Sequence, residues 1–240
     1  MPPHRGPRLL VRLERRSCIR RRPRNPLETG YLTGVLAVAV ALAVLAGCEG
    51  LPQLPEAPPS TVRRAGETAR QNAAAIRRLG GTVDYGRVDP RTGQRSGIAA
   101  TITPAMVRAA SARELGSPAD PEIRPPGFAD LPARNRARGH LLGRQLGGSG
   151  AVASNLVALY QRRANSPVMR DYETAVAEAV ERGETIRYRV RLTYPSPTFK
   201  GPPRAVRITA SGNRGFRLDV LIDNSAEARV REYVPLPAGS

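Results

Sequence analysis

The chain has 240 residues and a formal net charge of +18, so it has room for one ordinary domain with terminal segments and favours an anionic partner. That partner would be nucleic acid or acidic lipid headgroups. The absence of tryptophan and an aromatic content of 4% argue against a base-stacking platform for single strands, and only two cysteines exclude a disulfide framework.

The N-terminal 47 residues are typical of a secretory signal. Many arginines precede an apolar run from Leu32 to Ala46, and the run ends in Leu45-Ala46-Gly47-Cys48. This tetrapeptide resembles a bacterial lipobox, which implies cleavage before Cys48 and lipid attachment to its sulfur. An uncleaved membrane helix is the alternative, because the run approaches spanning length. Both interpretations predict a membrane-tethered protein on the outer face of a bacterial membrane, either as an exported lipoprotein or through a single N-terminal transmembrane anchor, because the arginines stay inside.

A tether is predicted over residues 48–81. Its first part is rich in proline and indicates an extended, semi-rigid spacer. Residues 61–79 favour a helix, which is either short and solvated or a frayed continuation of the spacer. We expect the globular domain over residues 82–235.

The first part of that domain predicts two strands, one helix and a long loop. Thr103-Pro104 is typical of the cap and first turn of a helix, and Gly116 follows its end. Four prolines make the next eleven residues irregular, and long irregular loops are often functional. The expected elements are strands 83–88 and 97–103, a helix to residue 115 and a loop at 117–127.

The centre of the chain predicts two strands followed by a helix, a ββα unit. Strands are expected at 139–146 and 155–160, with a Gly-rich loop at 147–150 between them. Asn165 or Ser166 would cap a helix that runs to Gly183. Residues 185–194, 205–210 and 216–222 predict further antiparallel strands, so the fold class is α+β. The alternating Arg187, Arg189 and Arg191 are interpreted as a solvated sheet face rather than as a groove wall.

His140 is one of two histidines, and the other, His4, lies in the predicted signal segment. Within the predicted domain, His140 is therefore the only side chain that titrates near neutral pH without a large pKa shift. Its surroundings form an ordered set of short motifs. These are Tyr85-Gly86, Ala99-Ala100-Thr101-Ile102-Thr103, Arg138-Gly139-His140-Leu141-Leu142, Leu146-Gly147-Gly148, Asn155-Leu156-Val157, Asn165 and Met169-Arg170-Asp171-Tyr172-Glu173.

Through these motifs, residues 82–223 resemble the DNA/RNA non-specific endonuclease family, in its branch of secreted and toxin-associated bacterial nucleases. The resemblance implies a ββα-metal (His-Me finger) nuclease core with an antiparallel sheet and flanking helices. It also implies His140 as the general base and Asn165 as the direct ligand of Mg²⁺, or alternatively Mn²⁺. Arg138 would steady the phosphate. Asn155 and Glu173 would support the metal site from outside, with Glu173 accepting hydrogen bonds from water around the ion.

Two positions depart from the family pattern. Ala137 stands where the family often has an aspartate, so we expect weaker positioning rather than loss of activity. Ala177 stands where some relatives have an arginine, and Arg136 or Arg170 could replace it in binding phosphate. Two alternatives need no metal: Asn165 as a simple helix cap and Glu173 as a solvated helix residue.

The function implied is a metal-dependent, sequence-nonspecific endonuclease that hydrolyses phosphodiester bonds of DNA and RNA and is anchored at the outer face of a bacterial membrane. It would contact both nucleic acids through their phosphate backbones. The alternative is a catalytically weak or inactive lipoprotein that binds nucleic acid or another polyanion. The sequence does not identify a cognate inhibitor protein.

Overall fold

The computed structural model describes residues 59–234, which lie in a compact unit spanning Leu54–Ser240. The predicted signal segment, Cys48 and the proline-rich part of the tether lie outside the described residues. Among residues 59–234, no helix is both long enough and apolar enough to span a membrane.

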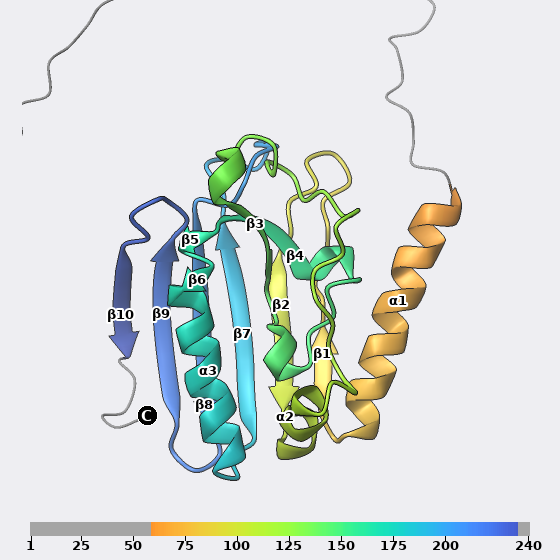
Figure 1. Cartoon of the computed structure of the whole chain (residues 1–240), viewed down its shortest axis with the longest axis vertical. Helices are drawn as coiled ribbons and strands as arrows, with labels where there is room; N and C mark the ends of the chain where they lie inside the picture. Colours follow the sequence, from red (N-terminus) through yellow and green to blue (C-terminus); the bar gives the residue numbers. More distant parts are fainter. Residues whose placement is uncertain (1–58, 235–240) are drawn as a thin grey trace, which may run out of the picture. The chain divides into compact units, whose positions relative to one another are not determined.

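A six-stranded antiparallel sheet forms one layer of the domain (Figure 1). The strand order is β1-β2-β7-β8-β9-β10. The bounds are β1 Thr82–Asp84, β2 Gly97–Ile102, β7 Ile186–Thr193, β8 Ala205–Gly212, β9 Arg217–Asp223 and β10 Val230–Val234. Because β2 pairs with β7, the sheet joins the two ends of the domain around the segment between them.

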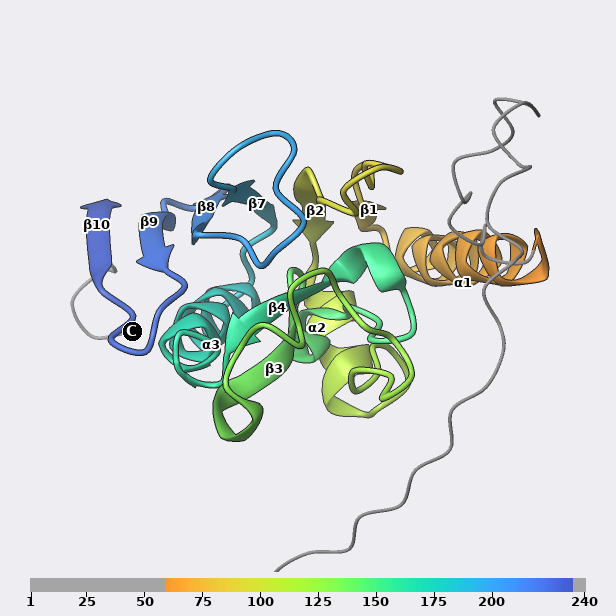
Figure 2. The same cartoon turned by 90° about the horizontal axis from the view of Figure 1, so that it is seen from above.

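The second layer covers one face of this sheet (Figure 2). It contains α2 (Pro104–Ser111), the antiparallel pair β3 (Arg136–His140) and β4 (Leu156–Tyr160), and α3 (Val168–Glu181). The short parallel pair β5 (Arg162–Arg163) and β6 (Ser166–Pro167) precedes α3, and single 3₁₀ turns occur at Ala133–Asn135, Arg144–Leu146 and Ala153–Asn155. The predicted α+β fold with a ββα unit is therefore confirmed.

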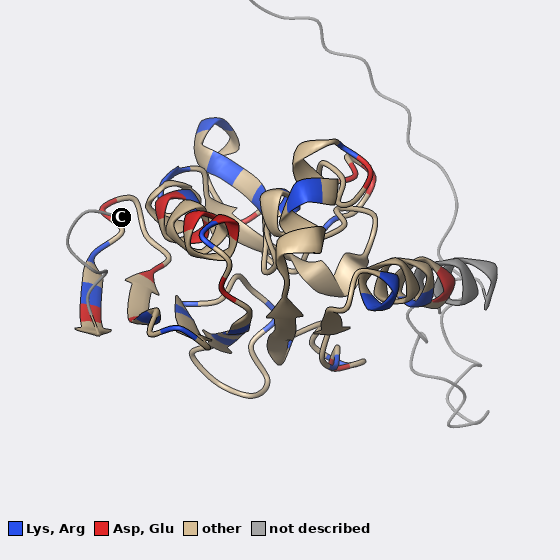
Figure 3. Cartoon of the chain, turned by 90° about the horizontal axis from the view of Figure 1, so that it is seen from below, with Lys and Arg blue, Asp and Glu red and all other residues tan. Residues whose placement is uncertain are grey.

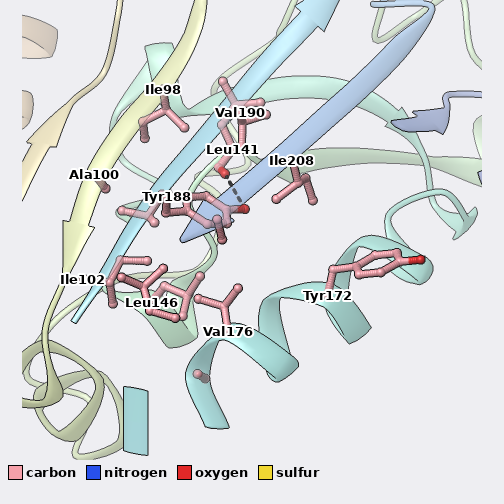
Figure 4. Packing of buried hydrophobic residues seen from close by; sticks show 14 of the residues in the cluster. Ile98, Ala100, Ile102, Leu141, Leu146, Tyr172, Val176, Tyr188, Val190 and Ile208 are labelled. Atoms are coloured by element: carbon pink, nitrogen blue, oxygen red, sulfur yellow. Dashed lines mark hydrogen bonds between the residues drawn. The ribbon is translucent and has the colours of Figure 1, made fainter. Parts of the chain in front are cut away.

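The core lies between the two layers (Figure 4). On β7, Ile186, Tyr188 and Val190 are at most 2% exposed, whereas the residues between them are exposed. This alternation follows from the two-residue period of a strand, and each fully buried side chain of this size stabilises the fold by about 1.5–3 kcal/mol. The Tyr188 hydroxyl donates to the Leu141 carbonyl at 3.4 Å, so the sheet also contacts the chain just after β3.

Helix α1 (Pro59–Arg78) joins the domain through its C-terminal half. Ile76 is fully buried in the core, and the Asn72 amide donates to the Gly147 carbonyl at 3.4 Å. The Tyr85 hydroxyl also donates a hydrogen bond to Asn72 Oδ1. The packed domain thus begins before the boundary predicted at residue 82, because the apolar face of the helix, although thin, has a partner.

Several local predictions need correction. The apolar run 139–146 is not a strand along its length, because β3 ends at His140 and the leucines after it turn inward. Leu141, Leu142 and Leu146 are fully buried in this turn, so their apolar character reflected burial rather than sheet pairing. Strand β10 was not predicted, and all five of its residues are exposed.

The predicted helix cap at Asn165 or Ser166 is also wrong. Helix α3 is preceded by Pro167, and no side chain caps its first turn. The predicted Thr103 cap of α2 is confirmed, since the Thr103 hydroxyl accepts from the Met106 amide at 3.3 Å. Asn165 is therefore free of the capping role that was the alternative to a functional one.

Candidate active site

A cavity of about 430 Å³ is lined by residues of the second layer. It brings together four of the predicted residues: His140 at the end of β3, Asn165 before β6, and Arg170 and Glu173 on α3. The remaining lining residues come from the end of α2 and the segment just after it, the turn after His140, β6 and the first turns of α3. They are Ala110, Ser111, Arg113, Gly143, Arg144, Gln145, Ser166 and Met169.

His140 is oriented by its contact with the loop that precedes β3. Its Nε2 lies 3.1 Å from the Ser117 carbonyl oxygen, and a carbonyl can only accept, so Nε2 carries the proton. In the neutral imidazole Nδ1 then has a free lone pair and can accept a proton. Burial lowers the pKa of His140 below its usual 6.5, the bond to Ser117 opposes this, and the positive charge of Arg144 lowers the pKa further. His140 is therefore neutral at pH 7.

Asn165 lines the same cavity. Its amide nitrogen donates to the Gln161 side chain at 3.0 Å, which leaves Oδ1 as the atom available to a ligand. A Cβ on Gly139 would lie 3.0 Å from this oxygen and 2.3 Å from Leu159 Cδ1. Glycine at the centre of Arg138-Gly139-His140 is therefore required by the close approach of Asn165 and the neighbouring strand.

Glu173 reaches the cavity from α3 and is only 8% exposed. Burial raises the pKa of its carboxyl group to about 8, and a hydrogen bond from the Gly143 backbone opposes the shift. A Cβ on Gly143 would lie 2.3 Å from Glu173 Oε2. The turn after His140 thus contacts the Glu173 carboxyl group through Gly143, and any larger residue at position 143 would displace that carboxyl group.

The chemistry of these groups fits a hard divalent cation. Asn165 supplies a neutral amide oxygen, and Glu173 supplies a carboxyl group whose raised pKa a nearby cation would lower, within a single cavity. In the described part of the chain no cluster of three or more His, Cys, Asp or Glu residues could hold a metal ion, so a site with several such ligands is not formed. Mg²⁺ needs few protein ligands because it keeps several of its waters.

Arg138 and Arg136 do not line this cavity. The Arg138 guanidinium donates through Nε to the Ile123 carbonyl at 2.6 Å and through Nη2 to the Pro121 carbonyl at 2.7 Å. The guanidinium carbons of Arg136 and Arg138 lie 4.8 and 4.4 Å from the centre of the Phe128 ring. Arg138 thus holds the proline-rich loop against β3 through hydrogen bonds, and both arginines make cation–π contacts with Phe128, just after this loop.

Asn155 is also outside the cavity, because it is fully buried beneath the turn after His140. Its Oδ1 accepts the Leu142 N–H at 2.8 Å, and its Nδ2 donates at 3.1 Å to the carbonyls of Leu142 and Ser149. All three contacts fasten the segment between β3 and β4. The prediction that Asn155 supports the site holds only in this indirect sense, through the backbone that follows His140.

Three arginines surround the cavity instead: the predicted Arg170, together with Arg113 and Arg144. All three are exposed. Arg113 has a left-handed backbone with φ of 64°. Sequence reasoning missed Arg113 and Arg144 because the first lies beyond α2 and only tertiary packing brings it to β3. For Arg144 the signal was its position four residues after His140. These guanidinium groups can contact the phosphates of a bound strand.

Comparison with known proteins yields one family and several structures. The model of a family described as DNA/RNA non-specific endonuclease matches residues 97–211. Sda1 nuclease with a bound zinc ion is 19% identical, with a TM-score of 0.49, and the match covers 60% of this chain and 75% of that one. NucA from Streptococcus agalactiae without metal is 19% identical, with a TM-score of 0.47 and coverages of 63% and 78%. Its magnesium-bound form is 17% identical, with a TM-score of 0.48 and the same coverages. No curated protein matches the chain.

Proposed function

The chain belongs to the DNA/RNA non-specific endonuclease family through residues 97–211, and we propose that it hydrolyses phosphodiester bonds of DNA and RNA with a divalent metal and little sequence preference. One observation carries this proposal. His140, Asn165 and Glu173 line a single cavity although they come from three separate elements of the chain. The cavity thus combines a base, a neutral oxygen ligand and a carboxylate, and three arginines surround them.

The reaction assigned to this cavity begins at His140. Its Nδ1 takes a proton from a water molecule as the water oxygen bonds to phosphorus, while the bond to the 3′-oxygen breaks. The products are a 5′-phosphate and a 3′-hydroxyl, with the 3′-oxygen protonated by solvent. The bond from Nε2 to Ser117 keeps the ring in the tautomer that this step needs.

Asn165 Oδ1 would hold the metal directly, and the Glu173 carboxylate would accept hydrogen bonds from water around the ion. A divalent cation there would neutralise charge on the phosphate and stabilise the leaving oxygen. Arg113, Arg144 and Arg170 would hold the backbone on either side of the scissile bond by charge alone, which accounts for weak sequence preference.

Incubation of the full chain with plasmid DNA and with RNA tests the proposal, with Mg²⁺ or Mn²⁺ in one series and EDTA in the other. We expect fragmentation of both substrates with metal and none with EDTA. His140→Ala should abolish cleavage while nucleic acid still binds. Cleavage at the wild-type rate by that variant would contradict the role of His140. If the wild type retards nucleic acid on a gel but does not fragment it with either metal, the alternative of a lipoprotein that binds nucleic acid without cleaving it is favoured.

We also propose that the protein is anchored at the outer face of a bacterial membrane by lipid on Cys48. The basic segment, apolar run and small-residue exit before Cys48 support this proposal. Cys48→Ala should move the protein from the membrane fraction to the soluble fraction and abolish labelling with a radioactive fatty acid. Retention of Cys48→Ala in the membrane without labelling would favour the transmembrane anchor.

A further inference from the structure

The face of the six-stranded sheet opposite the cavity carries a row of arginines on β7. Arg187, Arg189 and Arg191 alternate with Tyr188 and Val190, which point into the core. Successive side chains of a strand point to opposite faces, so these arginines point away from the second layer and from the active-site cavity. We call Arg187, Arg189 and Arg191 the arginine ridge. Figure 3 shows basic positions in blue on this sheet as well as on the opposite layer.

The ridge has no counter-charge of its own. The salt bridges among residues 59–234 join Arg207 to Asp219 and Arg231 to Asp223, and neither involves a ridge residue. Arg207 also lies directly across from Arg191 in the β7–β8 register. Asp219 compensates the charge of Arg207 through two hydrogen bonds, so the positive charge that no carboxylate pairs on these two strands is that of the ridge.

Two hollows adjoin the ridge. One of about 460 Å³ is lined by Arg187 and Arg189, and its remaining lining is mainly small residues of β1, β2 and β8, among them Ala99, Thr101, Thr209 and Ser211. A second of about 330 Å³ is lined only by Arg189, Arg191, Arg207 and Thr209. Guanidinium groups and hydroxyls are the donors that bind phosphate oxygens. Asp84, at the far edge of the first hollow, is the only carboxylate that lines either of them.

We propose that the arginine ridge is a second binding surface for the phosphate backbone of nucleic acid, separate from the site of cleavage. The proposal rests on the proposed function, since it takes nucleic acid as the substrate. Small and hydroxyl-bearing residues beside the ridge leave room for a strand to lie along it. A membrane surface fits less well, because basic membrane-binding surfaces combine charge with large apolar or aromatic side chains, whereas the first hollow is lined mainly by small residues and the second by three arginines and a threonine.

The position of the ridge determines which substrates use both surfaces. Duplex DNA has a persistence length of about 500 Å, so a duplex cannot curve from one face of this domain to the other at low cost. A long single strand can pass around the sheet edge. The ridge therefore favours long single-stranded DNA or RNA, which it holds while another segment of the same strand enters the cavity.

Measurement of nucleic-acid binding in EDTA tests the arginine ridge while cleavage is prevented. The full chain is titrated against a long oligo-dT strand over a range of salt concentrations. Three variants are compared: R187Q/R189Q/R191Q, the single variant R189Q, and R70Q/R77Q/R78Q. The last removes the same charge from exposed positions of α1 and is the matched control. The slope of log K against log salt should fall by about 2 in the ridge variant and by about 0.7 in R189Q, since each phosphate contact on a single strand contributes about 0.7.

The control should change the slope much less than the ridge variant does. Equal slopes in the ridge variant and the control would overturn the proposal. A ridge variant that loses binding to phosphatidylglycerol vesicles but keeps its slope on oligo-dT would overturn it too, and would identify the face as a membrane surface. Cleavage of a short duplex by the wild type with Mg²⁺ is measured separately. Its absence would refute the proposed nuclease without bearing on the binding result.

Discussion

Replacement of Asn155 by alanine distinguishes a residue that fastens the fold from one that takes part in the reaction. The side chain is fully buried and satisfies one N–H and two carbonyl groups of the segment 142–149. Removal of one partner of a buried hydrogen bond costs about 1–3 kcal/mol for each group left unsatisfied. Water that enters the vacated space would reduce this cost. We therefore expect Asn155→Ala to lower the free energy of unfolding by about 3–5 kcal/mol, toward the lower end of the summed cost.

This loss is a large fraction of the total stability of a domain, which is about 5–15 kcal/mol. With a urea dependence of about 2 kcal/mol per molar, the unfolding midpoint would fall by about 2 M. Asn213→Ala is the matched control, because Asn213 is exposed and accepts one hydrogen bond, from the Thr185 N–H at 2.9 Å. Urea unfolding followed by circular dichroism measures both variants. If Asn155→Ala unfolds at the same urea concentration as Asn213→Ala but no longer cleaves DNA, Asn155 acts in the reaction itself and the structural role assigned to it is wrong.

Three further outcomes are expected. Cleavage should decline as pH falls through the pKa of His140, because protonation of Nδ1 removes the base. The midpoint of the decline in kcat/KM should lie below pH 6.5, since burial lowers the pKa of His140. A midpoint above 6.5 would contradict the buried environment assigned to His140. Gly143→Ala should lower kcat, because the added Cβ would displace the Glu173 carboxyl group. Gly66→Ala is the control and should leave cleavage unchanged, because a Cβ there would meet nothing within 4 Å. Equal activities in the two variants would count against the contact between Gly143 and Glu173. Without metal, the raised pKa of Glu173 means that the folded state binds its proton more tightly than the unfolded state, so this group's contribution to stability is lost as pH rises from 4.5 to about 8. Glu173→Gln should therefore have a higher melting temperature than the wild type at pH 9 in EDTA, and it should cleave more slowly with Mg²⁺. A melting temperature below that of the wild type in EDTA would refute the argument that burial of the charged carboxylate costs stability.

The arginines near His140 show where sequence reasoning about the site succeeds and fails. The placement of Asn165 and Glu173 could be predicted from the sequence, because Asn165 shortly precedes α3 and Glu173 lies on it, and this helix packs against the turn after His140. The role of Arg138 was not readable, because its partners are carbonyl groups of the loop at 121–123 and the ring of Phe128. A side chain next to a catalytic residue in sequence can be held elsewhere by a loop whose path no local pattern determines.

The same distinction applies to the fold. Two-residue alternation in β7 and the Thr103 cap of α2 are local effects of side-chain direction and hydrogen bonding, so the sequence alone determined them. Helix α1 has too thin an apolar face to indicate packing, yet Ile76 is fully buried because strands distant in sequence complete its surroundings.

By itself, the sequence determined the ββα order, the predicted base His140, and the glycine that precedes it. Only the tertiary structure decided which cations lie around the cavity, that Asn155 fastens a turn, and that the row of arginines on β7 borders hollows rather than a flat solvated face. The physical reason is that hydrogen-bond partners and neighbouring charges depend on contacts between segments far apart in the chain. Strand and helix periodicities depend only on adjacent residues.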